Sequence, residues 1–513
     1  MPLPPVRVVS ARESAERDRA AIDGGVPSQV LMERAGTGAA DEISRRYPEQ
    51  LRDGAVVFTG PGNNGGDGWV VAGCLAREGV KVTVVEVVAP KSPDAAARKK
   101  ASVDSVTVAA TAPEDGVTVV IDALLGTGSE GEPRGKIADG ITSINRLRSN
   151  GARVAALDLP SGLDATTGAH SACVVADVSL SFGAVKRGAL LARDSCGEIV
   201  VLDIGLDDNA RSIDDQLPLL IDGNWVKSHI PPIRYNAHKG TRKHLAVIGG
   251  GPGMPGAVVL VCRAALRSGI GLVRALVAPS NVGAILEASP SALISDWPTS
   301  KLEISAGISK WADAIVIGPG LGRTDETREL VERILRDSQL PALLDADALN
   351  VFEGDAKAFA ALLRGKPALI TPHVAEFARL AGVSVDEVLA NRFDIGQELS
   401  DMLGAAVLLK GSPTVVFTPA GERFVIARGT AALGTGGSGD ILSGIGGTLL
   451  AQTGDAVLAA CCSAWVHGRA AELCEYVRGT TLEDVLYALP RAWNESDPRP
   501  TPPILATLPA VAQ

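Results

Sequence analysis

Short runs of apolar, often β-branched residues recur along the chain and alternate with segments of helical length. Nearly every position in these runs is apolar, which is typical of parallel strands that helices cover on both faces. The pattern therefore predicts an α/β protein built on two sheets. We expect one series of strands at 55–60, 81–88, 117–125, 153–159, 178–182 and 198–204, and a second at 243–249, 272–277, 314–317, 341–344, 368–371, 406–410 and 414–417.

The segment between the two series marks a domain boundary. It reads PLLIDGNWVKSHIPPIRYNAHKG from Pro218, is rich in proline and polar residues, and has no sustained periodicity. A chain of 513 residues is long enough for two large domains. We expect a first domain at 1–220, a linker at 221–235, a second domain at 236–495, and a Pro-rich tail at 496–513 that is disordered.

Composition narrows the class of protein. The 57 glycines and the 4% of aromatic residues suit many short strands joined by tight turns. A net charge of −10 without a strongly basic stretch disfavours a nucleic-acid partner. Seven cysteines without a CxxC pair indicate buried thiols in a reducing compartment. The N-terminus lacks a signal-peptide core and arginines interrupt the apolar stretch 256–278, so we expect a cytoplasmic protein without a membrane partner.

The first candidate site is the turn TGPGNNGGDG, Thr59–Gly68, which joins a predicted strand to an apolar helix. A glycine-rich turn before a helix presents backbone N–H groups to an anion. This turn also carries two carboxamides and a carboxylate, from Asn63, Asn64 and Asp67. It therefore suggests a site for phosphate together with a second, polar or cationic, group.

Three more loops follow predicted strand ends, where open α/β sheets bind their ligands. They are DALLGTGSEGE (Asp122–Glu132), DLPSGLD (Asp158–Asp164) and SFGAVKRG (Ser181–Gly188). Each places an acid, a hydroxyl or a cation beside glycines that allow close approach of a ligand. A single Asp at a strand end also suits the N-cap of the next helix, but the four loops together favour a site.

In this order, GPGNNGGDG, DALLGTG and DLPSGLD resemble the NAD(P)H-hydrate epimerase domain, over about residues 5–215. The resemblance implies a Rossmann-like fold, potassium held by Asn64, Asp122 and Ser161, and Asp158 at the hydrated ring. It also implies that the phosphates and ribose of hydrated NADH or NADPH contact Asn63, Asn64, Gly65, Gly66, Asp67, Gly126, Thr127, Gly128, Ser129, Glu130, Gly131 and Glu132.

The chemistry of these side chains agrees with that implication. Carboxamide, carboxylate and hydroxyl oxygens are hard ligands, which suit an alkali cation better than zinc. Epimerisation at the hydrated carbon needs proton transfer, and Asp158 at a strand end is the candidate acid or base. The alternative is that Asp158 only accepts a hydrogen bond from a ribose hydroxyl.

The second domain contains the densest glycine run of the chain, GTAALGTGGSGDILSGIGG from Gly429. Stacked N–H groups at Gly436–Gly439 would form an anion hole, which stabilises developing phosphoryl charge. Asp440 follows immediately and is placed to take a proton from an attacking hydroxyl. GxGD before a helix of small apolar residues resembles the ribokinase superfamily.

Further motifs narrow this resemblance to the ADP- or ATP-dependent NAD(P)H-hydrate dehydratases, over about residues 235–490. They are AIVIGPGLG from Ala314, LDADALN from Leu344, TPHVAEF from Thr371 and VLLKGSPT from Val407. The resemblance implies a ribokinase-like fold, Mg²⁺ on the phosphates of ADP or ATP, and Asp440 as the base. It implies that Ala257, Gly320, His373 and Asp440 contact the hydrate, and that Lys410, Gly411, Ser412, Pro413, Thr414 and Gly439 hold the nucleotide.

Three of these side chains have simpler alternative roles. His373 could be a structural histidine, Lys410 could be a solvated residue at a strand end, and Glu376 could cap a helix or hold Mg²⁺ indirectly. The sequence KGTRKHLAVIGG also places Arg242 and Lys243 where we expect a small residue, which affects the prediction of specificity rather than of activity.

The two domains together predict repair of hydrated nicotinamide dinucleotides. The first would interconvert the R and S hydrates, and the second would phosphorylate the ring hydroxyl of the S hydrate so that it leaves as phosphate. One rival is a small-molecule kinase, such as a hydroxymethylpyrimidine or thiazole kinase, fused to an unrelated domain. Another is a first domain that only binds a ligand or partner. We expect small-molecule substrates and a homo-oligomer.

Overall fold

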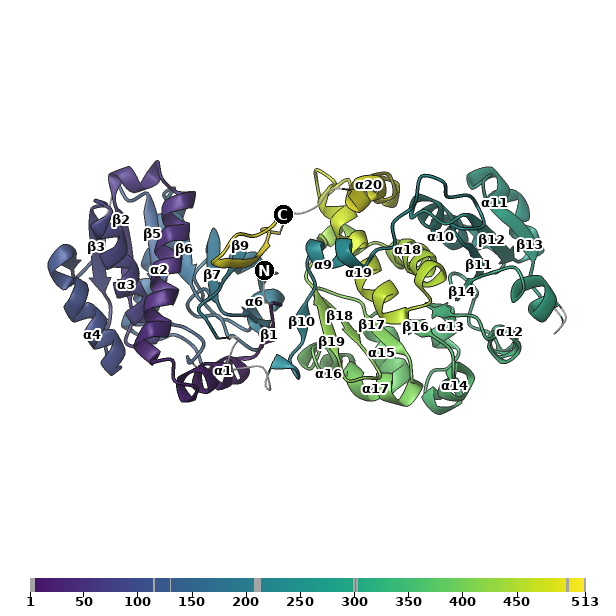
Figure 1. Ribbon diagram of the computed structural model, residues 1–513, viewed down its shortest axis with the longest axis horizontal. Coiled ribbons are helices and arrows are strands. Elements are labelled where there is room, and N and C mark those ends of the chain that lie inside the picture. Colours follow the sequence, from purple (N-terminus) through teal and green to yellow (C-terminus); the bar gives the residue numbers. More distant parts are fainter. Residues whose placement is uncertain are drawn as a thin grey trace. The chain divides into compact units, whose positions relative to one another are not determined.

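The computed structural model describes residues 5–113, 116–129, 131–206, 214–298, 300, 303–494 and 498–511. The chain divides into two compact units (Figure 1). The first holds the chain up to Leu220 together with Arg499–Val511, and the second runs from Ile221 to Pro498. The predicted linker at 221–235 therefore falls within the second unit, where it contributes the helix α9 (Gly223–His229).

The first unit is built on an eight-stranded sheet in the order β20-β9-β7-β6-β5-β2-β3-β4. All neighbours in this sheet are parallel except β20, which is antiparallel to β9. The six strands expected from the sequence are present as β2 (Ala55–Thr59), β3 (Val82–Glu86), β5 (Val119–Ala123), β6 (Arg153–Leu157), β7 (Val178–Phe182) and β9 (Glu198–Leu202). The sequence did not indicate β4 (Thr107–Ala109) or β20 (Ile504–Leu508).

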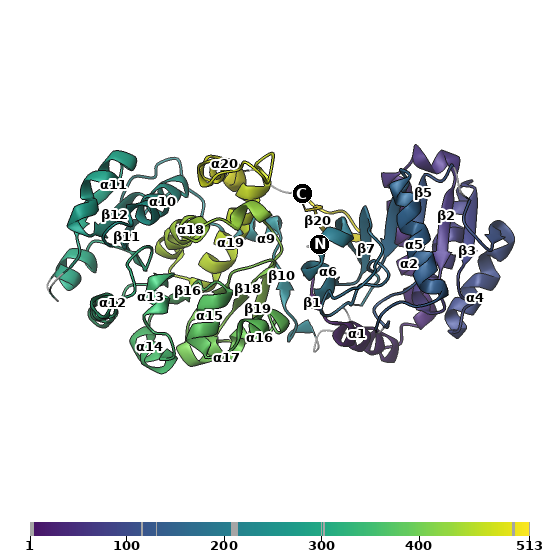
Figure 2. The same ribbon diagram turned by 180° about the vertical axis from the view of Figure 1, so that it is seen from behind.

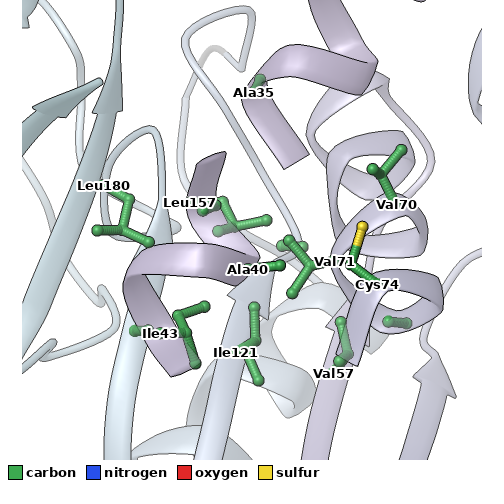
Figure 3. Packing of buried hydrophobic residues seen from close by; sticks show 14 of the residues in the cluster. Ala35, Ala40, Ile43, Val57, Val70, Val71, Cys74, Ile121, Leu157 and Leu180 are labelled. Carbon is green, nitrogen blue, oxygen red and sulfur yellow. The ribbon is translucent and has the colours of Figure 1, made fainter. Parts of the chain in front are cut away.

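Both faces of this sheet are covered, which explains why its strands are apolar at successive positions. Because side chains alternate between the two faces of a strand, Val57 and Ile121 pack under α2 (Ser28–Arg46) and α3 (Asn63–Arg77), as Figure 3 shows. Their neighbours Val56 and Val120 pack on the opposite face with α5 (Lys136–Ser149). The unit is therefore the three-layer αβα sandwich that the apolar pattern predicted.

Shorter elements complete the first unit. β1 and β8 pair in a two-stranded parallel sheet, and β8 lies in the segment that follows β7. The remaining elements are β1 (Val8–Val9), α1 (Ala11–Asp23), η1 (Gln50–Asp53), α4 (Pro93–Ser102), η2 (Val103–Ser105), β8 (Val185–Lys186), α6 (Arg187–Leu191), α7 (Arg193–Cys196) and β10 (Leu219–Leu220) at the border.

Nine strands of the second unit lie in the order β19-β18-β17-β16-β15-β14-β11-β12-β13. They are parallel from β17 to β13, whereas β18 and β19 are antiparallel additions at one edge. Their bounds are β11 (His244–Ile248), β12 (Leu272–Val277), β13 (Leu293–Asp296), β14 (Ala314–Ile317), β15 (Ala342–Leu344), β16 (Ala368–Ile370), β17 (Ala406–Leu409), β18 (Thr414–Phe417) and β19 (Arg423–Ile426).

Helices cover both faces of this second sheet as well (Figure 1). The long helix α18 (Ser438–Thr453) can lie close to the strands because Gly447 has no side chain; a Cβ there would come within 2.4 Å of Val316 Cγ2. The other helices are α10 (Pro255–Arg267), η3 (Pro279–Asn281), α11 (Val282–Ala288), the π-helix η4 (Glu303–Ile308), α12 (Asp325–Asp337), α13 (Asp347–Asn350), α14 (Ala356–Leu363), α15 (Val374–Ala381), α16 (Val385–Ala390), α17 (Gly396–Leu403), η5 (Ala431–Leu433), α19 (Ala456–Glu472) and α20 (Leu482–Asn494).

The prediction of a disordered tail at 496–513 was wrong for residues 504–508. These residues form β20, whose backbone pairs with β9 and whose Leu505, Ala506 and Leu508 are buried. Prolines on both sides hid the strand, because they suggest an irregular segment and its partner lies about three hundred residues away in sequence.

Two expectations from composition can also be compared with the structure. All seven cysteines are free, and six of them are buried, as predicted. Among the residues that the structure describes, none of the helices has the length and apolar character needed to span a bilayer.

Candidate active sites

Two loops of the first unit meet at the carboxyl ends of β2 and β5. Helix α3 begins at Asn63, so the NNGGD motif forms its first turn, whose N–H groups lack acceptors within the helix. The loops are in close contact, because a Cβ on Gly60 would lie 1.8 Å from the carbonyl oxygen of Leu124. A Cβ on Gly65 would likewise lie 2.1 Å from the carbonyl oxygen of Gly60. Only glycine fits at these two positions, and the backbone of the turn is thereby fixed.

Asn64, Asp122 and Ser161 are brought together around the carbonyl of Leu125. The Asn64 amide donates to this carbonyl at 2.8 Å, and Ser161 Oγ lies 3.3 Å from it and 2.6 Å from Asp122 Oδ1. Within the described structure, the buried Asn64 Oδ1 has no hydrogen-bond donor. Burial raises the pKa of Asp122 to about 6, although hydrogen bonds from Ser161 oppose the shift. The cluster therefore offers hard oxygen atoms and an incompletely compensated carboxylate.

Asp158 forms a buried ion pair with Lys186, which lies on β8. The Lys186 ammonium donates to Asp158 Oδ1 and also to the carbonyls of Phe182 at 3.1 Å and Ala184 at 3.4 Å. The backbone N–H of Phe182 donates to the same Asp158 oxygen at 3.2 Å. Asp158 has a left-handed backbone with φ 67°, a conformation uncommon for residues other than glycine. One carboxylate oxygen is thus held by two donors, while its other oxygen makes none of these contacts.

Two further carboxyl groups lie near this ion pair. Burial, and then the charges of Asp158 and Asp18, raise the pKa of Asp67 well above its usual value. Burial also raises the pKa of Asp18, on α1, although Lys186 opposes that shift. Asp158, Asp67 and Asp18 therefore all interact electrostatically with the Lys186 ammonium, and the raised pKa values favour the protonated forms of Asp67 and Asp18.

The loop after β5 lies beside the cluster of Asn64, Asp122 and Ser161. Gly126 is close to the site, since a Cβ there would lie 3.2 Å from Asn64 Cβ, and Ser129 Oγ donates back to the Gly126 carbonyl at 2.9 Å. Of the other candidates, Thr127 is half-buried, Gly128, Gly131 and Glu132 are exposed, and Glu130 lies outside the described residues.

In the second unit, the glycine run forms the N-terminus of α18. Gly437 precedes the helix with φ 97°, and a Cβ on it would lie 2.8 Å from both Leu260 and Leu482. Asp440 lies in the first turn and its N–H donates to the Gly437 carbonyl at 3.0 Å. The helix begins at Ser438, earlier than the sequence indicated, so the carboxyl group of Asp440 lies beside the open N–H groups of the turn.

The partly buried Lys410 and the buried Asp345 form an ion pair next to this turn. Lys410 Nζ lies 2.8 Å from Asp345 Oδ1, and Ser443 Oγ donates to Asp345 Oδ2 at 2.9 Å. A Cβ on Gly439 would lie 3.1 Å from Lys410 Nζ, so the glycine allows the ammonium to approach the helix N-terminus. Burial alone would lower the pKa of Lys410, but the carboxylates of Asp345 and Glu376 raise it overall. Lys410 is therefore a fixed cation and not a solvated residue at a strand end.

The groups around Asp440 raise the pKa of its carboxyl group. Burial, and then the Asp345 carboxylate, raise its pKa to about 7 against the opposing effect of Lys410. His467 on α19 lies 3.4 Å from Ser438 Oγ through its Nε2, and burial followed by the Lys410 charge lowers the pKa of His467 to about 4. An acid with a pKa near 7 is well matched to proton transfer at neutral pH.

His373 and Glu376 cap α15 reciprocally. His373 Nδ1 accepts from the N–H of Ala375 at 3.1 Å, and Glu376 Oε2 accepts from the N–H of His373 at 2.9 Å. His373 therefore has the structural role, and Glu376 the capping role, that the sequence left open as alternatives. His373 is nevertheless half exposed, and Glu376 Oε2 lies 3.8 Å from Lys410 Nζ. Burial lowers the pKa of His373, which favours the neutral ring.

Two more groups of candidate residues lie close together in the structure. Ala257 and Gly320 lie together, because a Cβ on Gly320 would be 3.2 Å from Ala257 Cβ. The loop Lys410–Thr414 is held by the buried Arg392, whose Nη1 donates to the carbonyls of Lys410 at 3.3 Å and Pro413 at 3.2 Å. Thr414 Oγ1 donates to the Gly411 carbonyl at 3.1 Å.

Sequence reasoning missed Asp18, Asp345, Arg392 and His467, and it did not pair Lys186 with Asp158. Asp345 and Lys186 lie within motifs that the sequence already indicated, LDADALN and SFGAVKRG, and could have been noticed there. Asp18, Arg392 and His467 lie on other elements, and their spacing gave no indication of a shared site.

The chain resembles known proteins over most of its length. Residues 245–491 match the family described as NAD(P)H-hydrate dehydratase, and residues 28–188 match the family described as YjeF-related protein N-terminus. The bifunctional NAD(P)H-hydrate repair enzyme Nnr of Escherichia coli (strain K12) is 34% identical over 484 residues, which span 92% of this chain and 90% of that protein. The protein of the same description from Moorella thermoacetica is 33% identical and covers 92% of this chain and 93% of its own length.

One of the similar solved structures is the ADP/ATP-dependent NAD(P)H-hydrate dehydratase from Bacillus subtilis, co-crystallised with ATP/Mg²⁺. It is 30% identical, covers 53% of this chain and 96% of its own, and has a TM-score of 0.48.

Proposed function

The chain belongs to the family of bifunctional NAD(P)H-hydrate repair enzymes, and on this premise we propose which residues carry each of its two activities. The first unit epimerises the R and S hydrates of NADH and NADPH. The second removes water from the S hydrate at the expense of a nucleotide, ADP or ATP. The observation that supports the second assignment best is the set formed by Asp440, Lys410 and the N-terminus of α18.

In the second unit, Asp440 takes the proton from the ring hydroxyl as that oxygen attacks the terminal phosphorus of the nucleotide. The backbone N–H groups at Gly437–Gly439 stabilise the charge on the phosphoryl oxygens, and Lys410 contributes a fixed positive charge beside them. The phosphorylated hydroxyl is a good leaving group, so the lone pair of the ring nitrogen expels phosphate. Loss of a proton from the neighbouring ring carbon then restores the dihydronicotinamide.

The nucleotide and the hydrate each have a set of residues in this proposal. Arg392 fixes the loop from Lys410 to Thr414, which holds the nucleotide together with Gly439. Ala257, Gly320 and His373 contact the hydrate. In this proposal, Mg²⁺ would be bound chiefly by the nucleotide phosphates.

In the first unit, Asp158 is the group that contacts the hydrated ring. Since Lys186 and the Phe182 N–H occupy Oδ1, the other oxygen is left for a hydrogen bond to the ring hydroxyl. The N–H groups at the start of α3, with Asn63 to Asp67, bind the phosphates and ribose, assisted by the loop Gly126–Glu132.

Potassium fits the remaining cluster. The unpartnered Asn64 Oδ1, the Asp122 carboxylate with its raised pKa and the Ser161 hydroxyl would hold the cation. Bound there, it would supply positive charge between Asp122 and the anionic substrate.

One experiment tests both assignments together. With nucleotide, Mg²⁺ and potassium, the wild-type chain should convert a mixture of R and S hydrates to NADH in one phase, followed by the absorbance of the dihydropyridine. Asp158→Asn should give a biphasic course, in which the S hydrate disappears quickly and the R hydrate only at its spontaneous rate. Equal consumption of both epimers by this variant, measured by chiral separation, would contradict the role of Asp158.

The same reaction separates this proposal from the kinase alternative. A small-molecule kinase leaves a stable phosphorylated product, whereas the dehydratase releases phosphate and restores the dinucleotide. We place the enzyme in the cytoplasm, in keeping with its free, mostly buried thiols, and expect a homo-oligomer, which light scattering would test.

A further inference from the structure

The strand β20 completes the sheet of the first unit, although it follows the whole second unit in sequence. It pairs with β9 in antiparallel register, with Ile504 opposite Leu202 and Leu508 opposite Ile199. Figure 2 labels β20 in the first unit, close to the C-terminus of the chain. We propose that the epimerase unit is a discontinuous domain whose last strand is this C-terminal segment, and that epimerase activity depends on residues 499–511. The activity named in this inference rests on the proposed function, whereas the requirement for the strand does not.

The contacts of β20 are those of a core strand. Leu505, Ala506 and Leu508 are only 5%, 4% and 4% exposed, and Ile504 packs against the main hydrophobic cluster. Pro503 lies against α2, since a Cβ on Gly38 would be 3.8 Å from its Cγ. Hydrogen bonds also hold both ends of the segment, from the Asp203 N–H to the Pro503 carbonyl at 2.7 Å and from Arg193 to the Pro509 carbonyl.

Removal of β20 would leave β9 at the edge of the sheet. Ile199, Val200, Val201 and Leu202 are each no more than 1% exposed, so this edge would present unpaired backbone groups along an apolar strand. Such an edge is prone to pair with another chain. The C-terminal strand therefore covers the edge of β9, which would otherwise be open to pairing with another chain.

The strand is also linked to the epimerase site through β9. Leu202, which is opposite Ile504, accepts a hydrogen bond from the Gly183 N–H at 2.8 Å. Gly183 follows Phe182, whose N–H donates to Asp158, and the same loop leads to Lys186. If β9 became disordered, the hydrogen bond between Leu202 and Gly183 would be lost, and the loop that positions Asp158 and Lys186 would be less well held.

The experiment compares a chain truncated after Pro498 with one truncated after Val511. Hydrogen exchange of the β9 amides is measured, together with interconversion of a single hydrate epimer and nucleotide-dependent dehydration of the S hydrate. For the shorter chain we expect amide exchange to be faster by at least about tenfold and epimerisation slower by at least about tenfold, because local protection depends on pairing. Dehydration should stay within about twofold, because the second unit has its own core.

Point variants of the intact chain provide a second test. Leu505→Asp should reproduce the faster exchange, while Thr507→Asp, on the same strand but exposed, should not. Addition of a peptide of residues 499–511 to the shorter chain should restore protection of β9. Unchanged protection of β9 and unchanged epimerisation after removal of the segment would overturn the inference. A wild-type chain without epimerase activity would overturn the proposed function instead, and the exchange data would still decide the role of β20.

Discussion

The raised pKa of Asp440 leads to a prediction about the pH dependence of dehydration. The base must be ionised to accept a proton, and burial followed by the Asp345 carboxylate raises its pKa from an ordinary 3.8 to about 7. The ionised fraction is then roughly a tenth at pH 6 and roughly nine tenths at pH 8. We expect kcat/KM for the S hydrate to rise about tenfold over this range, and Asp440→Asn to lower it by about 10² to 10⁴ while epimerisation continues.

The assay uses freshly prepared S hydrate and initial rates of dihydropyridine absorbance at a fixed nucleotide concentration. Asp345→Asn should move the inflection to lower pH by about one unit or more, because it removes a neighbouring negative charge and releases Lys410 from its ion pair. Ser443→Ala is the matched control, since it removes a hydrogen bond to Asp345 but changes no charge. A flat profile between pH 6 and pH 8, or an inflection that Asp345→Asn leaves in place, would refute the assignment of Asp440 as the base.

Three further predictions concern Asp122, Lys186 and Gly439. The pKa of Asp122 in the folded protein is about 6, above its ordinary 3.8, so ionisation of Asp122 destabilises the folded first unit as pH rises through this interval. Bound potassium would offset the charge of the ionised carboxylate, so potassium should raise the melting temperature more at pH 7.5 than at pH 5. Asp122→Ala should abolish this difference. Equal stabilisation at both pH values would argue against this site. Lys186→Met should lower kcat of epimerisation at least about tenfold and leave dehydration intact, because it strands a buried carboxylate, and Lys186→Arg should recover part of the rate. An unchanged rate in Lys186→Met would exclude the positioning role. Gly439→Ala should weaken nucleotide binding measured by calorimetry, since its Cβ would lie 3.1 Å from Lys410 Nζ, whereas Gly283→Ala, with open space around it, should bind normally. Normal binding by Gly439→Ala would remove the steric argument.

The strands at the centre of each sheet could be predicted because burial on both faces leaves a strong local signal. Val57 and Phe58, for example, face opposite layers and are both apolar. Edge strands lack that signal: β13 (Leu293–Asp296) is largely exposed, and β19 begins at Arg423. The strand β20 is a stronger case, because prolines flank it and its partner β9 lies about three hundred residues away in sequence.

The glycine-rich loops of the candidate sites could be found from the sequence because their backbone geometry requires glycine locally. The charges around them could not. Asp345 belongs to a quoted motif, but nothing in the spacing indicated that its carboxylate pairs with Lys410. Asp18 raises the pKa of Asp67, and His467 contacts Ser438, from helices that are remote in sequence. Interactions of this kind can be seen only in the folded structure.

The two candidate sites use buried charge in opposite ways, and this difference is consistent with the roles that we propose for Asp158 and Asp440. In the first unit, Lys186 holds the Asp158 carboxylate in place, which suits a group that must keep one oxygen available while a hydroxyl changes faces. In the second, Lys410 is occupied by Asp345, so Asp440 remains poorly compensated and retains affinity for a proton. A base that takes a proton from a hydroxyl needs that affinity, whereas an orienting carboxylate does not. If the phosphorylating site accepts only the S hydrate, as proposed, the R hydrate would accumulate without the first activity. If β20 is required as we propose, only a chain synthesised through its second unit can complete the epimerase sheet, so that the two activities are made in equal amounts.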